Sequence, residues 1–443
     1  MSVNKYLQKI EQKNAQIHVS INKVPFEGCT GWYYDEAAGE IRNSNRTFFQ
    51  VTGIKSTVSG HEVHQPIILQ HEIGYIGIIR KLIDGEMRYL MQYKIEPGNV
   101  NQIQISPTLQ ATKSNFTQQH GGAKPAYLEY FLNAKKYRII VDQVQSEQSS
   151  RFLAKRNRNI IIELSPDEEI EVLPNFDWMT LRELKQLMRY DNLVNMDTRT
   201  GLSCLPFSVC RHSPDELTEI EKGFSDKALF NSVYKGDGSN ILPEIFQYIN
   251  DYKMFSVGSR ELIPLFSLSG WSMQNGEFVC SEPYSFKAVF CDIEIEGREV
   301  KHWCQPLFEA TGAALFGLFT CVDNGVRKFL VKAKPEIGCL DGIELGPSVQ
   351  REFVSSEERD GVDELFDKKL REKHGVIFDT LLSEEGGRFY HEQNRNVMIE
   401  IEKNELELPE GCFWSDYKTL NTLVQVNNVL NIQLRNLLSV LEL

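Results

Sequence analysis

The chain contains two copies of one sequence pattern. Gln65-Pro66 recurs as Gln305-Pro306, and the same offset of 240 holds without a gap over more than forty positions. The other pairs at this offset are Lys94 and Lys334, Glu96 and Glu336, Gly98 and Gly338, Pro107 and Pro347, and Gln110 and Gln350. A period this long indicates a duplicated domain rather than a solenoid of short repeats. We therefore expect two copies of one fold.

The register between the copies drifts only slightly outside that block. Trp32 returns as Trp271, and Arg151-Phe152 returns as Arg388-Phe389. A chain of 443 residues is long enough for each half to bury its own core. The expected organisation is a first copy over residues 1–207, a linker over 208–240 that contains Gly236-Asp237-Gly238-Ser239, and a second copy over 241–443.

Each copy is predicted to mix strands and helices. The pattern predicts an opening amphipathic helix, strands at 47–54, 66–69, 73–79, 102–105, 139–144 and 160–164, and a polar helix from about 107 to 119. Asp84-Gly85 is a hairpin turn signal. A closing helix is expected near Trp178 and near Trp414, with N-cap residues at 179–180 and 415–416. This order is typical of an α+β fold and not of a doubly wound parallel sheet.

Composition narrows the class of protein. A net charge of −13 argues against a nucleic-acid binder, because phosphate contacts require a basic face. The nine cysteines are scattered without metal-ligand spacing, so we expect free thiols in a reducing cytoplasm. The N-terminus has no apolar signal region and no run approaches membrane-spanning length, which predicts a soluble cytoplasmic protein.

The segment 114–121 can be aligned with the core of the Nudix box. Gln118 and Gln119 fall where the two metal-binding glutamates of the box belong, and Asn115 falls on the first glutamate. A neutral amide is a much weaker ligand for Mg²⁺ than a carboxylate. The alignment therefore predicts a Nudix-like scaffold with no metal site.

A longer signature carries a more specific resemblance. Residues 94–99, 104–117 and 126–131 together resemble the sugar-nucleotide 2,3-dehydratase family, and the tandem arrangement fits that family over nearly the whole chain. The resemblance implies two tandem Nudix-like modules, one of them a relic, and a homodimer that needs neither metal nor cofactor. It also implies a dTDP-4-keto-6-deoxyhexose substrate and a downstream 3-ketoreductase that acts on the product.

The implied reaction sets clear chemical requirements. A base removes the C3 proton, an electrophile stabilises the enolate at O4, and an acid helps the C2 hydroxyl to leave. The absence of a GxGxxG strand–helix unit agrees with a reaction that needs no redox cofactor. The first copy carries suitable side chains between 106 and 130, whereas the matching stretch of the second copy is a charged run. We expect the first copy to hold the active site.

Five residues are candidates for the chemistry. Glu129 is a candidate base if burial between Tyr127 and Tyr130 raises its pKa, and His120 could act as base or acid near neutral pH. Tyr127 or Tyr130 could donate a proton, and Lys94 could polarise the C4 carbonyl. The alternatives are a surface glutamate, a helix-capping histidine, packed aromatic rings and a structural ion pair between Lys94 and Glu96.

Further residues are candidates for binding. For the substrate they are Trp32, Ser106, Thr108, Gln110, Thr112, Lys113, Ser114, Asn115, Arg151, Arg156 and Asn157. For a second pocket they are Trp271, Lys334, Gln350, Arg388 and Arg395. The arginines suit a pyrophosphate and the tryptophans could stack on a base, while a solvated basic turn and core tryptophans are the alternatives.

Two other functions fit parts of the pattern. A metal-dependent nucleotide-sugar hydrolase would require carboxylates where the chain has Asn115, Gln118 and Gln119. A non-catalytic nucleotide-sugar sensor would not need the asymmetry between the copies. Dependence on Mg²⁺ distinguishes the hydrolase, and binding without turnover distinguishes the sensor.

Overall fold

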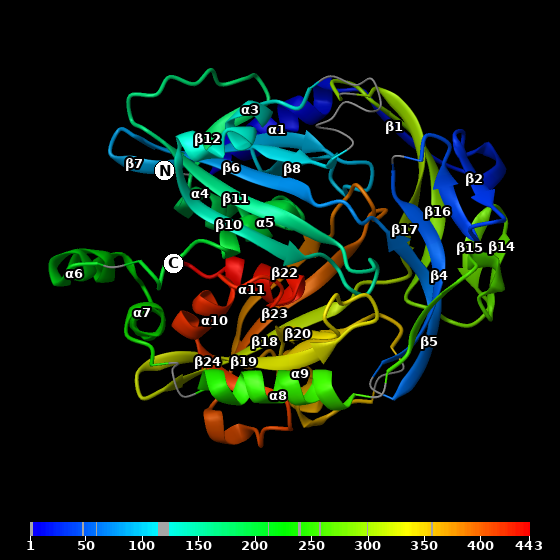
Figure 1. Cartoon of the computed structure of the whole chain (residues 1–443). Helices are drawn as coiled ribbons and strands as arrows, with labels where there is room; N and C mark the ends of the chain where they lie inside the picture. Colours follow the sequence, from blue (N-terminus) through cyan, green and yellow to red (C-terminus); the bar gives the residue numbers. More distant parts are fainter. Residues whose placement is uncertain are drawn as a thin grey trace.

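Both copies build the same succession of elements, which confirms the duplication and the α+β class (Figure 1). The computed structural model describes residues 3–46, 48–58, 60–113, 124–210, 212–237, 241–256, 258–298, 300–355 and 358–443. In the first copy the elements are α1 (Asn4–Gln16), β1 (Val19–Val24), β2 (Trp32–Asp35), β3 (Glu40–Asn43), β4 (Gln50–Val58), β5 (His61–Leu69), β6 (Gly74–Ile83), β7 (Glu86–Ile95), β8 (Ile103–Ser106), β9 (Leu109–Ala111), α3 (Leu128–Leu132), β10 (Arg138–Ser146), β11 (Arg156–Leu164), β12 (Phe176–Thr180), α4 (Leu181–Leu187) and α5 (Met196–Ser203). In the second copy they are α8 (Ile241–Phe255), β13 (Arg260–Ile263), β14 (Trp271–Gln274), β15 (Glu277–Cys280), β16 (Phe286–Ile295), β17 (His302–Ala310), β18 (Leu315–Asp323), β19 (Val326–Pro335), β20 (Ile343–Pro347), β21 (Val349–Arg351), α9 (Gly361–Glu372), β22 (Val376–Ser383), β23 (Gln393–Glu400), β24 (Cys412–Asp416), α10 (Tyr417–Leu423) and α11 (Ile432–Ser439).

Each copy contributes one seven-stranded sheet. The first sheet has the order β10-β11-β6-β7-β12, with β8 on β7 and β9 on β6. The second repeats this order as β22-β23-β18-β19-β24, with β20 on β19 and β21 on β18. In both sheets one central pair is parallel and the others are antiparallel, because β11 pairs with β6 and β23 with β18. The same topology has therefore formed twice.

The two copies exchange their first strands. Strand β1 of the first copy pairs with β16 of the second, and β13 of the second pairs with β4 of the first. These strands complete two five-stranded sheets that lie together at one end of the molecule (Figure 1). The copies are consequently interlocked by backbone hydrogen bonds and do not only touch through side chains.

Two buried helices form the centre of the molecule. Helices α5 and α11 pack against each other between the two large sheets, and every residue of both is buried (Figure 1). Arg199 on α5 donates to the carbonyls of Val194 and Ser383, each at 2.7 Å. Its counterpart Arg435 on α11 donates to Thr200 Oγ1 and to the carbonyl of Ser146. Both arginines thus join one copy to the other.

A pair of glycines closes the interface near the exchanged strands. The N–H of Gly98 donates to the carbonyl of Gly386 at 2.7 Å, and the N–H of Gly338 donates to the carbonyl of Ser149 at 2.7 Å. A Cβ added at Gly98 would lie 1.6 Å from the carbonyl oxygen of Phe389. Only glycine fits at this crossing, which explains why it recurs in both copies.

Several predicted local features are confirmed. Asp84 and Gly85 both have positive φ in the turn that joins β6 to β7. Thr180 and Asp416 cap α4 and α10, and each side chain accepts a hydrogen bond from the backbone N–H three residues later. The closing helices begin after these caps, so the prediction that they start near Trp178 and Trp414 is off by a few residues because both tryptophans lie in strands.

The predicted helix over about 107–119 is wrong at its start. Leu109–Ala111 form β9, which pairs with β6 through Tyr75, Ile76 and Gly77. The apolar side chains of Leu109 and Ala111 alternate with Gln110 and enter the core, which is a strand pattern. Residues 114–123, including the segment aligned with the Nudix box, lie outside the described residues.

The connection between the copies carries two helices, α6 (Pro214–Gly223) and α7 (Lys227–Tyr234). Phe230 and Val233 of α7 are buried, and α7 contacts β19. All nine cysteines are free thiols and seven are buried. Among the described helices, none is long and apolar enough to cross a membrane.

Candidate active site

A cavity of about 340 Å³ lies between the first large sheet and loops of the second copy. The first copy supplies its lining from Asn43, Asn45, Phe48, Gln70, Gly74, Tyr75, Ile76, Lys94, Glu96, Pro97, Gln110, Ala111, Thr112, Glu147, Phe152, Lys155, Asn157 and Asp197. The second copy supplies Arg298, Val300, Trp303, Cys304, Gln305, Glu385, Gly387 and Arg388. Trp303, Cys304 and Gln305 belong to β17, which pairs with β16, the strand that receives β1 of the first copy.

Lys94 stands at the end of β7 and is held by two acceptors. Its Nζ lies 2.5 Å from Glu96 Oε1 and donates to Gln110 Oε1 at 3.1 Å. Arg298 of the second copy also reaches Glu96 Oε1, at 3.3 Å. Burial alone would raise the pKa of Glu96, but Lys94 and Arg298 outweigh it and lower that pKa to about 2. Glu96 is therefore a fixed anion that orients two cations at the cavity.

Three further carboxyl groups line the same cavity. Burial raises the pKa of Glu147 to about 7, although Arg435 and Lys155 oppose the shift. Burial also raises the pKa of Glu385, and it raises that of Asp197 well above the ordinary aspartate range, with Glu147 and Glu385 adding to the effect. Like charges that share a buried site cannot all ionise near neutral pH. This cluster can therefore hold and release protons at physiological pH.

Hydrogen bonds orient two members of this cluster. Asn157 Nδ2 donates to Glu147 Oε1 at 2.7 Å, and the backbone N–H of Gly387 donates to Glu385 Oε1 at 3.1 Å. Asp197 differs, because its Oδ1 is buried with no hydrogen-bond partner within the described part of the chain. Lys155 adds a cation whose Nζ donates to the Glu72 carbonyl at 2.6 Å, and burial lowers its pKa to about 8.

The second copy supplies an arginine and aromatic surface. Arg388 Nε donates to Gln70 Oε1 at 3.3 Å, and its guanidinium lies over the Phe49 ring, 4.2 Å from the centre. Phe48 and Trp303 line the cavity. Such a combination of guanidinium groups and rings suits a ligand that carries both phosphate and a flat heterocycle.

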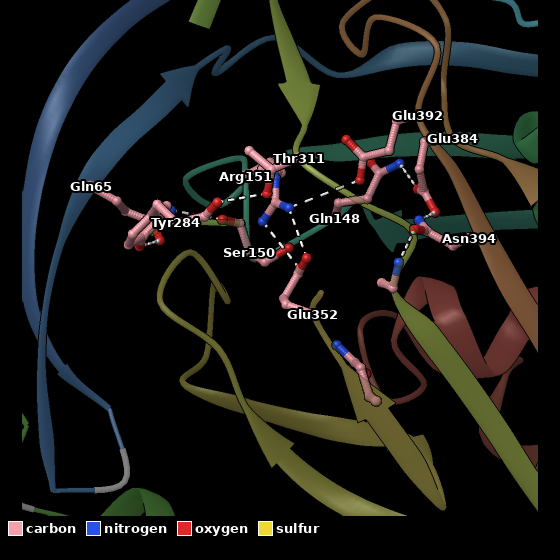
Figure 2. Close-up of polar contacts among 12 residues, drawn as sticks. Gln65, Gln148, Ser150, Arg151, Tyr284, Thr311, Glu352, Glu384, Glu392 and Asn394 are labelled. Carbon is pink, nitrogen blue, oxygen red and sulfur yellow. Dashed lines mark hydrogen bonds and ion pairs between the residues drawn. The ribbon is translucent and has the colours of Figure 1, made fainter. Parts of the chain in front are cut away.

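The corresponding place in the second copy is occupied by a protein ion pair. Arg151, the counterpart of Arg388, extends from the first copy and donates to both carboxylate oxygens of Glu352 at 3.2 and 2.9 Å. It also lies 3.9 Å from Glu392, and Gln148 reaches Glu384 at 2.7 Å (Figure 2). Here the duplicated arginine joins the two copies.

Five of the residues predicted from the sequence meet at the cavity: Lys94, Gln110, Thr112, Asn157 and Arg388. Four of these had been expected to act on the substrate: Lys94 in the chemistry, and Gln110, Thr112 and Asn157 in binding. Arg388 had been expected in the second pocket, whereas the structure places it in the lining of this cavity together with residues of the first copy.

The structure places Glu129, Tyr127 and Tyr130 outside the cavity lining. Glu129 is exposed and forms an ion pair with Lys124, which lowers its pKa instead of raising it. Tyr127 donates its hydroxyl hydrogen to the Glu171 carbonyl at 2.8 Å and packs with Tyr130 at the edge of a hydrophobic cluster. The expected burial between two tyrosines does not occur, since the short helix α3 turns Glu129 toward solvent.

Other predicted substrate residues support the fold. Thr108 Oγ1 accepts from the Ile79 N–H at 2.9 Å and donates to the Leu90 carbonyl, and Ser106 is buried in β8. Trp32 is a core residue whose Nε1 donates to the Cys304 carbonyl at 2.6 Å. Lys113 is exposed, and Arg151 and Arg156 do not line the cavity. His120, Ser114 and Asn115 lie outside the described residues.

The remaining residues expected in a second pocket are dispersed. Trp271 is buried in the core and donates to the His64 carbonyl at 3.1 Å. Gln350 donates to Glu336 at 3.0 Å on the sheet that also carries Lys334. Arg395 forms an exposed ion pair with Asp379. These contacts are internal to the protein.

Sequence reasoning missed Glu147, Lys155, Asp197, Arg298 and Glu385. A comparison of the copies could have found three of them, because Lys155 aligns with Glu392, Glu385 with Gln148 and Asp197 with Gln433 at the offsets already evident nearby. Differences in charge at equivalent positions indicate that the two copies do not have the same function. Arg298 carried no such signal, because it lies between the blocks of constant offset and reaches the cavity from the other copy.

Within the described residues, no group of three or more histidine, cysteine, aspartate or glutamate side chains is arranged to hold a metal ion. The lysines, arginines and carboxyl groups of the cavity are instead arranged to bind an anion and to move protons.

Comparison with known proteins agrees with this chemistry. Residues 3–205 and 242–441 both match the family model described as NDP-hexose 2,3-dehydratase. The chain is 36% identical over 428 residues to a dTDP-4-dehydro-6-deoxy-alpha-D-glucopyranose 2,3-dehydratase of Saccharopolyspora spinosa, covering 95% of this chain and 87% of that protein. Proteins with the same description from Streptomyces violaceoruber and Amycolatopsis orientalis are 34% and 31% identical, each over 97% of this chain and over 94% and 88% of their own lengths.

Proposed function

The chain belongs to the NDP-hexose 2,3-dehydratase family, and we propose that its cavity converts dTDP-4-keto-6-deoxy-D-glucose into the 3,4-diketo-2,6-dideoxy sugar nucleotide. The reaction is a hydro-lyase step in deoxysugar biosynthesis. The observation that carries this assignment is the cluster of buried carboxyl groups and cations that both copies build around one cavity. The names of the relatives support the thymidine nucleotide and the 4-keto sugar.

Glu147 is the proposed base for the C3 proton. Among the three carboxyl groups with raised pKa values, it is the one favoured as an anion by both Lys155 and Arg435. A pKa of about 7 suits a general base at neutral pH, because the group is largely ionised and still basic enough to take a proton. Asn157 holds one carboxylate oxygen and so fixes the direction of the other.

Lys94 is the proposed partner of O4. Removal of the C3 proton places negative charge on that oxygen, and a buried ammonium group stabilises it strongly. The ion pair with Glu96 and the hydrogen bond to Gln110 hold the Lys94 ammonium in one position. Because its pKa is lowered to about 2, Glu96 is an anion and provides a fixed counter-charge for Lys94 at the cavity.

The nucleotide is proposed to bind toward the second copy. Arg388 and Arg298 offer guanidinium groups for the pyrophosphate. Phe48 and Trp303 offer apolar ring surface for the thymine. This orientation directs the sugar toward Glu147, Lys94 and Asp197.

The test is an incubation of EDTA-treated protein with dTDP-4-keto-6-deoxyglucose in deuterated water, followed by mass spectrometry. We expect loss of one water and one deuterium at C2, which enters when the enol becomes a ketone. Release of a nucleoside monophosphate only after Mg²⁺ is added would establish the hydrolase instead. Bound but intact substrate in both conditions would establish the sensor.

Three expectations from the sequence remain part of the proposal, one from its composition and two from the family resemblance. The enzyme acts in the cytoplasm as a homodimer, and a 3-ketoreductase consumes its diketone product. Light scattering of the purified protein tests the dimer. A coupled assay with a 3-ketoreductase tests the product, because only a 3-keto group can be reduced at that carbon.

A further inference from the structure

Asp197 is the least satisfied acid in the cavity. Its side chain is 2% exposed, it lines the cavity, and its Oδ1 has no hydrogen-bond partner among the described residues. A buried carboxyl oxygen without a partner is costly and is uncommon in a folded protein. A partnerless carboxyl oxygen on a residue that lines a cavity points to a group that receives its partner from a ligand.

Stabilisation of helix α5 does not explain why a carboxyl group is present at position 197. Asp197 lies in the first turn of α5, where an acidic residue can favour a helix. However, that helix is already capped by Asn195, whose side chain accepts from the Thr198 N–H at 2.8 Å. The equivalent position on α11 is the neutral Gln433, and α11 begins with the same asparagine cap. The helix therefore forms without a carboxyl group at this position.

The surroundings of Asp197 keep its proton in place. Burial raises its pKa most, and the nearby charges of Glu147 and Glu385 raise it further, while Lys94 opposes them. Lys155 and Arg435 favour the charged form of Glu147, whereas at Asp197 the effect of Lys94 is outweighed by burial and by Glu147 and Glu385, so Asp197 retains its proton when Glu147 ionises. One cavity then presents an ionised carboxylate and a neutral carboxylic acid.

We propose that Asp197 is the general acid that protonates the departing C2 hydroxyl group. This inference rests on the proposed function and assigns one residue to one of its steps. Glu147 takes the C3 proton and leaves an enolate whose charge on O4 is stabilised by Lys94. The enolate electrons then form the C2–C3 double bond, and the C2–O bond breaks as the Asp197 proton moves to that oxygen. Water leaves, Asp197 becomes a carboxylate, and Glu147 is protonated.

The second half of the reaction restores both groups. The proton on Glu147 exchanges with solvent, and a solvent-derived proton then passes from Glu147 to C2 as the enol becomes a ketone. The proton of the enol hydroxyl at C3 returns to Asp197. The sum is loss of one water from the substrate, with no net oxidation and no other reactant.

The test uses the full-length protein with Asp197→Asn, which keeps the shape and removes the transferable proton. Loss of a general acid is expected to lower the dehydration rate about 100-fold or more. In deuterated water, the variant is expected to return unreacted substrate with deuterium at C3, because Glu147 still removes that proton. The matched control is Gln433→Asn in the second copy, which should dehydrate at the wild-type rate.

A second substrate separates acid catalysis from misfolding. Fluoride needs no proton to leave, so a 2-deoxy-2-fluoro analogue of the substrate should lose it at rates within about tenfold in the two proteins. The proposal is overturned if Asp197→Asn dehydrates the natural substrate normally. It is also overturned if the variant binds dTDP but neither exchanges the C3 proton nor releases fluoride. Failure of wild-type protein to remove water from the natural substrate would instead refute the proposed function.

Discussion

Arg151 of the first copy forms a two-pronged ion pair with Glu352 of the second, at 3.2 and 2.9 Å. The first copy has Thr112 where the second has Glu352, and it is Thr112 that lines the cavity together with Arg388. Within the described residues no carboxylate lies in ion-pair distance of Arg388. The duplicated arginine therefore stabilises the protein in one copy and is positioned for a ligand in the other.

This difference predicts opposite effects of equivalent substitutions. Arg388→Met should weaken binding of dTDP about 100-fold or more, because a guanidinium contact to phosphate is lost. Arg151→Met should leave binding nearly unchanged but lower the free energy of unfolding by about 3 kcal/mol, since Glu352 and Glu392 lose a buried partner. Calorimetric titration and urea unfolding of both variants measure the two quantities. Equal loss of binding in both variants would contradict the assignment.

Thr112 is predicted to keep the cavity of the first copy open. Thr112→Glu introduces the carboxylate that the second copy has at Glu352, so Arg388 should pair with it and lose its place for the pyrophosphate. We expect dTDP affinity to fall by at least about tenfold, the effect of one lost charged contact. Thr112→Ser is the control and should bind as the wild type does. Unchanged affinity in Thr112→Glu would show that this residue does not control the cavity.

The duplication and most strands could be predicted from the sequence because they depend on local patterns. The hairpin at Asp84-Gly85 and the caps at Thr180 and Asp416 are of this kind. The exchange of β1 and β13 left no local trace, since either strand satisfies the same pattern in its own sheet or in the other. The sequence led to Lys94, Gln110, Thr112 and Asn157 of the first copy, but local patterns did not indicate that Glu385 and Arg298 of the second copy line the same cavity.

Glu129 shows a different limit of sequence reasoning. Its tyrosine neighbours suggested burial, yet burial depends on which face of a five-residue helix meets the sheet. Asp197 shows the opposite case, because it was not among the candidate residues and is a buried acid in the structure. Only the tertiary structure shows that Glu129 is exposed and that Asp197 is buried.

The reaction rate should depend on pH through Glu147. As the base it must be ionised, and its pKa is raised to about 7 by burial, so kcat/KM should fall about tenfold for each pH unit below that value. The same shift makes the folded protein bind more protons than the unfolded chain between 4.5 and about 7, so acidification in this range favours folding at this group. Loss of rate without loss of structure is expected, with dTDP binding over the same range as the control. A rate that stays flat down to pH 5 would exclude Glu147 as the base.

The sites of Gly98 and Gly338, where the backbones of the two copies cross, should tolerate no side chain. Gly98→Ala places a Cβ 1.6 Å from the Phe389 carbonyl oxygen, and we expect the free energy of unfolding to fall by about 3 kcal/mol or more. Gly338→Ala should act similarly, because its Cβ would lie 1.8 Å from the Phe152 carbonyl oxygen. Gly223→Ala is the control, since nothing lies within 4 Å of its added Cβ. Thermal unfolding of the three variants measures the effect, and a wild-type midpoint in Gly98→Ala would contradict the interlocked interface.

The most direct test of the account compares equivalent glutamates of the two copies. Glu147 accepts from Asn157, and its counterpart Glu384 accepts from Asn394, both at 2.7 Å. Single-turnover dehydration of dTDP-4-keto-6-deoxyglucose should slow about 1,000-fold in Glu147→Gln, within the range of a lost general base, and should stay near the wild-type rate in Glu384→Gln. A full rate in Glu147→Gln, or a lost one only in Glu384→Gln, would contradict an active site in the cavity of the first copy.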